Sequence, residues 1–247
     1  MRFNIYREAR LSLMILSLVL TLCVIFCLVA SMFTSMGYKG LMTSTNMDKT
    51  SCHSMPVIII DAGHGGEDPG AVANGLVEKY LNLEIAKMIN EMLKANGYKT
   101  HLTREDDRLL YNIGEENRKK HFDIRNRIKI ANEFEEAIFV SIHMNKFPAE
   151  YCKGLQTFYN NENESGKLLA ELIQKNVRKL QTDNRRVIAD GKESIYLLKK
   201  LEIPATLIEC GFLSNFEEAA LLNNDNYKLS LTMSIYCGIA DFMENVK

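Results

Sequence analysis

The sequence predicts an α/β fold, a three-layer sandwich in which helices cover both faces of a twisted, mostly parallel sheet. Short apolar runs typical of buried strands alternate with segments whose apolar residues recur at helical spacing. Residues 57–60 are apolar throughout, as expected for a strand that is buried on both faces. The 247 residues include 47% hydrophobic and 25% charged residues, a composition that excludes a disordered chain.

Residues 56–247 are expected to form one domain. After the strand at 57–60, apolar residues from Leu81 to Met92 lie on one face of a helix that Gly97 ends. The next expected elements are a strand at 98–103, a helix around 124–131, strands at 137–143 and 155–159, a helix at 166–180, strands at 194–198 and 205–210, and a helix at 227–246. Residues 105–120 are charged, and we interpret them as a solvated loop in preference to a lip over a cleft or a docking segment.

Residues 1–33 predict a cytoplasmic stub followed by a transmembrane anchor or a signal peptide. No charged residue occurs from Leu11 to Tyr38, and residues 11–33 are apolar enough for one helix across a bilayer. Three arginines precede this segment, so the N-terminus is expected in the cytoplasm and the domain outside. The alternative is a signal cleaved near Val29-Ala-Ser31, but the length of the apolar segment favours a retained anchor. Either form is exported and extracytoplasmic.

Residues 34–55 are predicted to be a linker, because Thr, Ser, Met, Gly and Asn dominate and apolar residues recur at neither helical nor strand spacing. A flexible chain of about 20 residues spans on the order of 25 Å. Residues 1–55 hold five Lys or Arg and two acids, a net charge of +3. The whole chain has a net charge of −1, so residues 56–247 carry −4. A mildly acidic domain gives no support to nucleic-acid binding.

The six cysteines show neither Cys-x-x-Cys pairing nor zinc-knuckle spacing. Two lie in the apolar N-terminal segment, and the others are Cys52, Cys152, Cys210 and Cys237. Export permits disulfides, yet the last two stand in apolar segments that favour buried thiols. We therefore predict no structural disulfide.

Two histidines and two glutamates stand where expected strands end or a helix begins: His64, Glu78, His143 and Glu209. In open α/β sheets, functional groups gather outside the carboxyl ends of the strands. Two imidazoles and one carboxylate are a common ligand set for catalytic zinc, and a second glutamate nearby is the usual proton carrier of a metallohydrolase. Together the four residues predict a metal-dependent hydrolase.

Each of these residues also has an ordinary structural interpretation. His64 could cap a strand within a glycine-rich turn, and Glu78 could offset the dipole of the helix it begins. His143 could be a core histidine at the end of an apolar strand. The convergence of all the residues at one sheet edge is what favours the metal site over these alternatives.

A buried carboxylate such as Glu209 is costly unless it is paired, and the structural alternative is an ion pair with Arg104 or Arg127. The remaining histidines are not expected to be ligands, because they lie in the linker, a short edge-like strand and a charged stretch: His53, His101 and His121.

Several motifs resemble those of the zinc-dependent N-acetylmuramoyl-L-alanine amidases of bacterial cell walls, in family order over nearly all of residues 56–247. The matching segments are Ile60-Asp-Ala-Gly-His-Gly-Gly-Glu-Asp-Pro-Gly-Ala71, Gly75-Leu-Val-Glu-Lys79 with Leu81-Asn-Leu83, Leu102-Thr-Arg104, Arg127-x-x-x-Ala-Asn132, Ser141-Ile-His-Met-Asn145 and Ile203-Pro-Ala-Thr-Leu-Ile-Glu-Cys-Gly-Phe-Leu-Ser-Asn215. The resemblance implies a phosphorylase/hydrolase-like fold and a zinc amidase catalytic domain at 56–247.

By that resemblance His64, Glu78 and His143 are the Zn²⁺ ligands and Glu209 is the catalytic residue. Asn145 and Arg104 are candidate substrate contacts, with strand-end capping as the alternative for both.

The implied reaction is hydrolysis of the amide between muramic acid and L-alanine of the stem peptide. The short form with one N-terminal anchor resembles the spore-cortex, germination-specific members, which prepare the glycan for muramic lactam. This implies cortex-type peptidoglycan as substrate, attachment to the forespore membrane through the N-terminal segment, and an activating protein partner. The alternatives are a catalytically silent peptidoglycan-binding or assembly protein and a zinc peptidase that cuts within the stem peptide.

Overall fold

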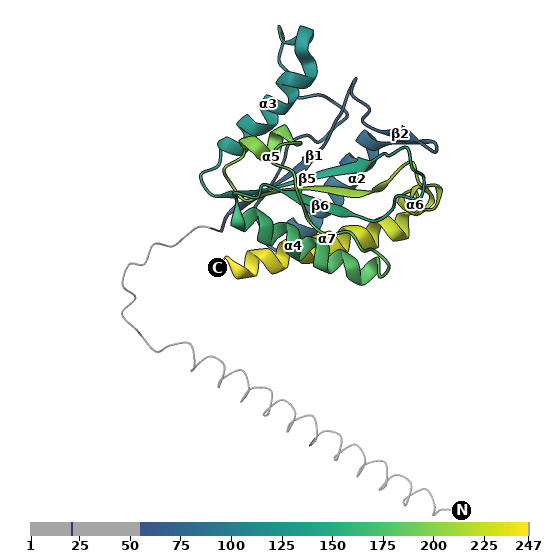
Figure 1. Cartoon of the computed structure of the whole chain (residues 1–247). Coiled ribbons are helices and arrows are strands. Elements are labelled where there is room, and N and C mark those ends of the chain that lie inside the picture. Colours follow the sequence, from purple (N-terminus) through teal and green to yellow (C-terminus); the bar gives the residue numbers. More distant parts are fainter. Residues whose placement is uncertain (1–20, 22–54, 247) are drawn as a thin grey trace, which may run out of the picture. The chain divides into compact units, whose positions relative to one another are not determined.

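The computed structural model describes Thr21 and residues 55–246 (Figure 1). The predicted anchor, the linker up to residue 54 and Cys52 therefore lie outside the described residues, apart from Thr21. No helix within the described part of the chain is both long and apolar enough to cross a membrane.

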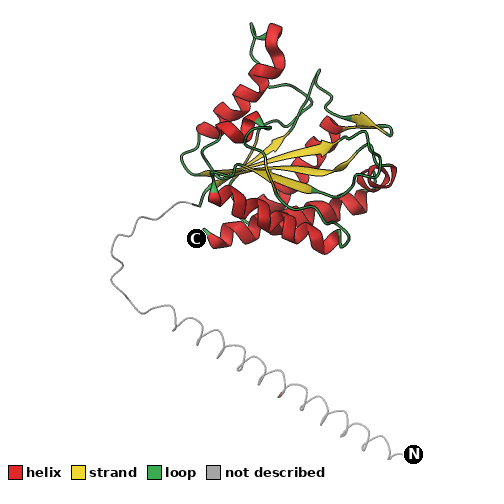
Figure 2. Cartoon of the chain, in the orientation of Figure 1, coloured by secondary structure: helices red, strands yellow, loops and turns green. Residues whose placement is uncertain are grey.

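Strands and helices alternate along the chain as expected (Figure 2). The elements are β1 (Val57–Ala62), β2 (Val72–Ala73), β3 (Leu76–Val77), α2 (Glu78–Ala95), β4 (Thr100–Leu102), η1 (Glu116–Arg118), α3 (Lys119–Asn132), β5 (Ala137–Asn145), β6 (Gln156–Tyr159), α4 (Glu164–Leu180), β7 (Ala189–Asp190), α5 (Tyr196–Lys200), β8 (Ala205–Phe212), α6 (Phe216–Leu222) and α7 (Asp225–Asn245).

The main sheet has the strand order β4-β1-β5-β8-β6-β7. The strands from β4 to β8 are parallel, β6 runs antiparallel to β8, and β7 is parallel to β6. Because β1, β5 and β8 are parallel neighbours, their carboxyl ends meet at one edge of the sheet. This confirms the predicted mostly parallel sheet.

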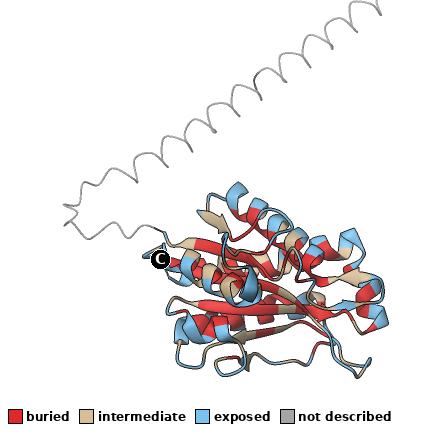
Figure 3. Cartoon of the chain, turned by 90° about the horizontal axis from the view of Figure 1, so that it is seen from above, coloured by how far each residue is buried: buried red, intermediate tan, exposed pale blue. Residues whose placement is uncertain are grey.

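Helices cover both faces of the sheet, with α4 and α7 on one side and α3 and α5 on the other (Figure 1). Successive residues of a strand point to opposite faces. Accordingly, Ile58 and Ile60 pack in the core formed with α2, α4 and α7, whereas Ile59 packs in the second core with α3 and α5. The central strands β1, β5 and β8 are largely buried and the outer helix faces are exposed (Figure 3), which confirms the three-layer sandwich.

The predicted strand at 194–198 is wrong, because this segment leads into the short helix α5. The β-branched and aromatic residues at 195–196 suggested a strand. However, Leu197, Leu198 and Leu201 recur at helical spacing, and all three are buried in the second core. The sheet instead ends with β7, which has only two residues and gives no periodic signal.

Candidate active site

The His64 side chain lies between two carboxylates. The residue follows β1 with φ +61°, a left-handed conformation that is uncommon outside glycine. Its Nδ1 lies 2.7 Å from Oδ2 of Asp68, and its Nε2 lies 3.2 Å from Oε1 of Glu78. Burial lowers the pKa of His64, but Glu78 and Asp68 outweigh this effect and raise the pKa to about 9. A carboxylate on Nδ1 orients the ring and leaves Nε2 to face the site.

Glu78 begins α2, and several donors fix its carboxylate. Oε2 accepts the N–H of Ala71 at 2.6 Å, and Oε1 accepts the N–H of Met144 at 3.0 Å. Asn82, one turn later on α2, donates its amide to Oε1 at 3.2 Å. Oε1 also lies 3.0 Å from Nδ1 of His143. Burial would raise the pKa of Glu78, but the two imidazoles hold it well below its usual range.

The His64, Glu78 and His143 side chains converge. Each offers one ligand atom, and these atoms all lie within 4.8 Å of one another. The two imidazole rings meet edge to face, with centroids 4.9 Å apart and an interplanar angle of 74°. Two imidazoles and a carboxylate, with a second carboxylate behind one imidazole, are the donor set and the supporting contact that zinc sites use. The residues present therefore fit a zinc ion.

Two glycines leave the space in which these side chains pack. A Cβ atom on Gly63 would lie 2.2 Å from Nε2 of His143. A Cβ atom on Gly70 would lie 2.4 Å from Oε2 of Glu78, and Gly70 has φ +65°. Both positions therefore require glycine, because any larger residue would displace a candidate ligand.

Glu209 lies next to His143 on the neighbouring strand, since the two residues are register partners in β5 and β8. Residues in register on adjacent strands point to the same face, so both side chains reach the same site. Within the described residues, Oε2 of Glu209 is buried without a hydrogen-bond partner. Burial raises the pKa of Glu209 to about 7, with His143 lowering it and Glu78 raising it further.

The alternative role for Glu209, an ion pair with Arg104 or Arg127, does not occur. Arg104 is 1% exposed, and its guanidinium donates to backbone carbonyls of Ala62, Gly63, Lys79 and Asp106. This arrangement favours a structural role for Arg104 over a substrate contact.

Arg127 is likewise buried and bonds the carboxylates of Asp61 and Asp123. It also donates to the backbone carbonyls of Ala62 and His64, which fixes the start of the loop that carries His64. Asn145, the last residue of β5, is partly exposed near the same edge.

Residues 105–120 contact the loop that follows β1. Asp107 accepts the N–H of Gly66 at 2.7 Å and the ammonium of Lys79 at 2.7 Å. In the first turn of α3, Lys119 pairs with Glu67 at 2.6 Å and Lys120 pairs with Asp68 at 2.7 Å. The segment thus borders the candidate site and is held there by charged contacts.

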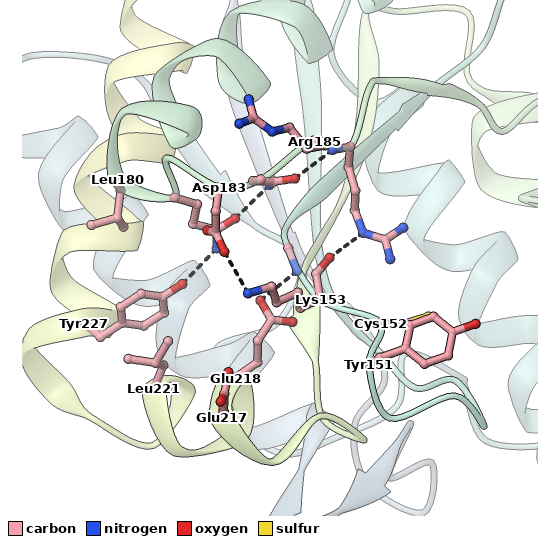
Figure 4. Close-up of a pocket in the computed structure, with 14 residues that line it drawn as sticks. Tyr151, Cys152, Lys153, Leu180, Asp183, Arg185, Glu217, Glu218, Leu221 and Tyr227 are labelled. Atoms are coloured by element: carbon pink, nitrogen blue, oxygen red, sulfur yellow. Dashed lines mark hydrogen bonds and ion pairs between the residues drawn. The ribbon is translucent and has the colours of Figure 1, made fainter.

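A pocket of about 530 Å³ lies elsewhere, between the end of α4, α6 and the start of α7 (Figure 4). Its polar groups pair with one another. Lys153 bonds Asp183 at 2.7 Å, Tyr227 accepts from Gln181 at 2.8 Å, and Glu218 accepts the N–H of Gly154 at 2.8 Å. None of the candidate catalytic or metal residues lines this pocket, so we assign it no part in the chemistry.

Sequence analysis did not identify Asp68 or Asn82 as part of the site. The signal was available for Asn82, because it follows Glu78 by four residues and so lies on the same side of α2. Asp68 follows His64 by four residues in an irregular loop, where spacing alone does not show which side chains meet.

Comparisons with known proteins agree with this geometry. Residues 58–241 match the family model described as N-acetylmuramoyl-L-alanine amidase. The chain is 37% identical over 202 residues to the germination-specific N-acetylmuramoyl-L-alanine amidase of Bacillus subtilis, covering 79% of this chain and 84% of that protein.

Two solved structures are also similar. The CwlD amidase from Clostridioides difficile, in complex with the GerS lipoprotein, superposes with a TM-score of 0.73 at 36% identity, covering 77% of this chain and 99% of that one. The catalytic domain of CwlV from Bacillus (Paenibacillus) polymyxa gives a TM-score of 0.67 at 30% identity, with coverage of 77% and 99%. The chain therefore belongs to the N-acetylmuramoyl-L-alanine amidase family, the peptidoglycan amidases that hydrolyse the bond between N-acetylmuramic acid and L-alanine.

Proposed function

We propose that this amidase is zinc-dependent and acts on spore-cortex peptidoglycan, with His64, Glu78 and His143 as the zinc ligands and Glu209 as the catalytic residue. One observation carries the assignment of roles. Three ligand atoms converge within 4.8 Å, while the Glu209 carboxylate stands beside them with a buried oxygen that is unpaired within the described residues.

A bound Zn²⁺ ion would supply Lewis acidity, which activates water near neutral pH and polarises the substrate carbonyl. The protein residues have distinct tasks. Asp68 orients His64, and the backbone N–H groups of Ala71 and Met144 hold Glu78. Glu209 takes a proton from the attacking water and passes it to the nitrogen of the leaving L-alanine. The amide C–N bond breaks, a C–O bond forms, and the products are a lactoyl carboxylate and a free amino group.

The cortex role is supported by the 37% identity to a germination-specific amidase. On this proposal the catalytic domain works outside the cytoplasm, tethered to the forespore membrane by residues 1–33, and prepares the glycan for muramic lactam formation. The C. difficile relative was solved in complex with a lipoprotein, which supports an activating protein partner for this chain as well.

The test is digestion of purified cortex and vegetative peptidoglycan with added zinc, followed by mass spectrometry of the fragments. We expect release of peptides with a free L-alanine amino terminus, loss of release with a chelator, and recovery when zinc is restored. Fragments cut between stem amino acids would identify a peptidase instead. Absence of any release by the zinc-loaded enzyme, with its partner present, would indicate a silent binding protein.

A further inference from the structure

The exposed charged residues within α3 are all basic, and with Arg118 of η1 they form a basic face; the exposed acids Glu116 and Glu133 stand before and after it in the chain. This basic face consists of Arg118, His121, Phe122, Arg125 and Lys129, which follow one another at helical spacing, and all but Phe122 are exposed. No acidic residue is exposed on α3. By contrast, exposed acids and bases alternate along α2 at Glu84, Lys87, Glu91 and Lys94.

The cations of the basic face are not used to hold the fold. Within residues 55–246, the ion pairs of α3 are made by Lys119, Lys120 and Arg127, and not by Arg118, Arg125 or Lys129. Arg118 and Arg125 instead stack on the Phe122 ring, at 5.6 and 5.9 Å from its centroid. The stacking orders two guanidinium groups while leaving them accessible, which lowers the entropy lost when an anion binds.

The basic face lies on the helix whose first turn contacts the loop of the candidate site. The N-terminal part of α3 projects from the domain (Figure 1), and the same turn contacts the loop after β1 through Glu67 and Asp68. Fourteen residues of helix span about 21 Å. A long polymer engaged at the site can therefore also reach this face.

We infer that the basic face binds carboxylates of the peptidoglycan strand and so holds the polymer beside the catalytic residues. This inference rests on the proposed function. A stem peptide attached through its amino end has a free carboxyl end unless it is crosslinked, and each hydrolysis leaves a further carboxylate on muramic acid. Guanidinium groups pair with carboxylates through two parallel hydrogen bonds. Each hydrolysis therefore exchanges the carboxylate of the departing peptide for one on muramic acid, so the strand keeps a ligand for this face as stem peptides are removed.

The test measures co-sedimentation of the full-length chain, in detergent and with zinc, with insoluble peptidoglycan. Glu209→Gln serves as the parent so that the polymer is not digested. In the test variant, Arg118, Arg125 and Lys129 are each changed to Gln. In the matched control, Lys87, Lys94 and Lys175 are changed to Gln, which removes the same charge from the α2 and α4 layer. Thermal melting verifies that each variant is folded.

We expect the α3 variant to bind about tenfold more weakly and the control to bind like the parent. Peptidoglycan whose carboxyl groups have been converted to amides should bind the parent as weakly as native peptidoglycan binds the α3 variant. Equal binding by parent and α3 variant, equal losses in both variants, or undiminished binding to the amidated polymer would each overturn the inference.

A separate assay distinguishes this inference from the proposed function. In a chain with intact Glu209, the three α3 substitutions should leave hydrolysis of a short soluble muropeptide unchanged. If the unmodified chain, loaded with zinc and with its partner present, cannot hydrolyse that muropeptide, the proposed function fails, whereas the binding result stands independently.

Discussion

The Asp68 carboxylate lies between His64 and Lys120, at 2.7 Å from each, and therefore links the imidazole of a candidate ligand to α3. We predict that Asp68→Ala lowers zinc affinity about 10–100-fold, because His64 loses the group that orients its ring. Metal titration with a competing chelator measures the change. Asp183→Ala, which removes an exposed partner of Lys153, is the control and should leave zinc affinity unaltered.

Substitution of Glu209 should lower turnover without lowering zinc binding. Glu209→Gln keeps the shape of the side chain but removes its ability to carry a proton, so we expect the variant to retain zinc and to lose about 10²–10⁴-fold in turnover. Atomic absorption gives the zinc content, and stem-peptide release gives the rate. A rate equal to that of the unmodified chain would remove Glu209 from the mechanism. In contrast, His143→Ala should reduce the zinc content itself.

At the residue scale, the sequence was sufficient to predict that the four candidate side chains lie at one edge of the sheet, because each stands at the end of a recognisable strand or the start of a helix. Which charged side chains pair with one another around them could not be predicted. Whether Arg127 pairs with Glu209 or with Asp61 depends on how α3 packs over β1, and a single sequence carries no direct signal for that packing.

At the scale of elements, the junction between α3 and β1 depends on a buried charge cluster. Arg127 bonds Asp61 and Asp123, and all three are buried. We predict that Arg127→Met lowers the free energy of unfolding by about 3–5 kcal/mol, because two buried carboxylates lose their partner. Denaturant titration measures the loss. Arg125→Met, on the exposed side of the same helix, should change it by less than about 0.5 kcal/mol.

The same cluster gives stability a pH dependence. Burial would raise the pKa of Asp61, but the Arg127 charge and the hydroxyls of Ser141 and Thr103 hold it below its usual range. An unfolded aspartate has a pKa of about 3.9, so below this pH the unfolded state binds more protons than the folded state. The contribution of Asp61 is thus full above about pH 4 and is lost as the pH falls further. Denaturant titrations at pH 7 and pH 3 should show Asp61→Asn approaching the unmodified chain on acidification.

Periodicity located the long elements well and the short ones poorly. The burial of Ile58 to Ile60 and of the apolar face of α2 follows directly from their patterns. The sequence predicts a strand where α5 lies, because five residues are too few to show a helical or a strand period. The burial of its leucines in the second core becomes evident only from the packing. The helix α6 was missed although Asn215 caps it and Glu218 follows three residues later, a recognised start signal.

For the whole molecule, the proposed division into anchor, linker and catalytic domain can be tested by truncation. A chain that begins at residue 55 retains every element of the sheet, so we expect it to fold without detergent and to melt at the same temperature as the catalytic unit of the full-length protein. Calorimetry of both forms provides the comparison. A markedly lower melting temperature would show that residues 1–54 contribute to the fold.

Strand β1 runs from the point where the chain enters the domain toward the candidate site. Its first residue lies at the edge of the sheet where the chain enters the domain, and the loop after its last residue carries His64. Six residues of strand span about 20 Å, so the point of entry and the candidate site lie at opposite edges of the sheet. If residues 1–33 tether the domain as proposed, this separation adds to the distance between the membrane and the site. We then expect glycan farther from the lipid to be processed before glycan lying directly against it.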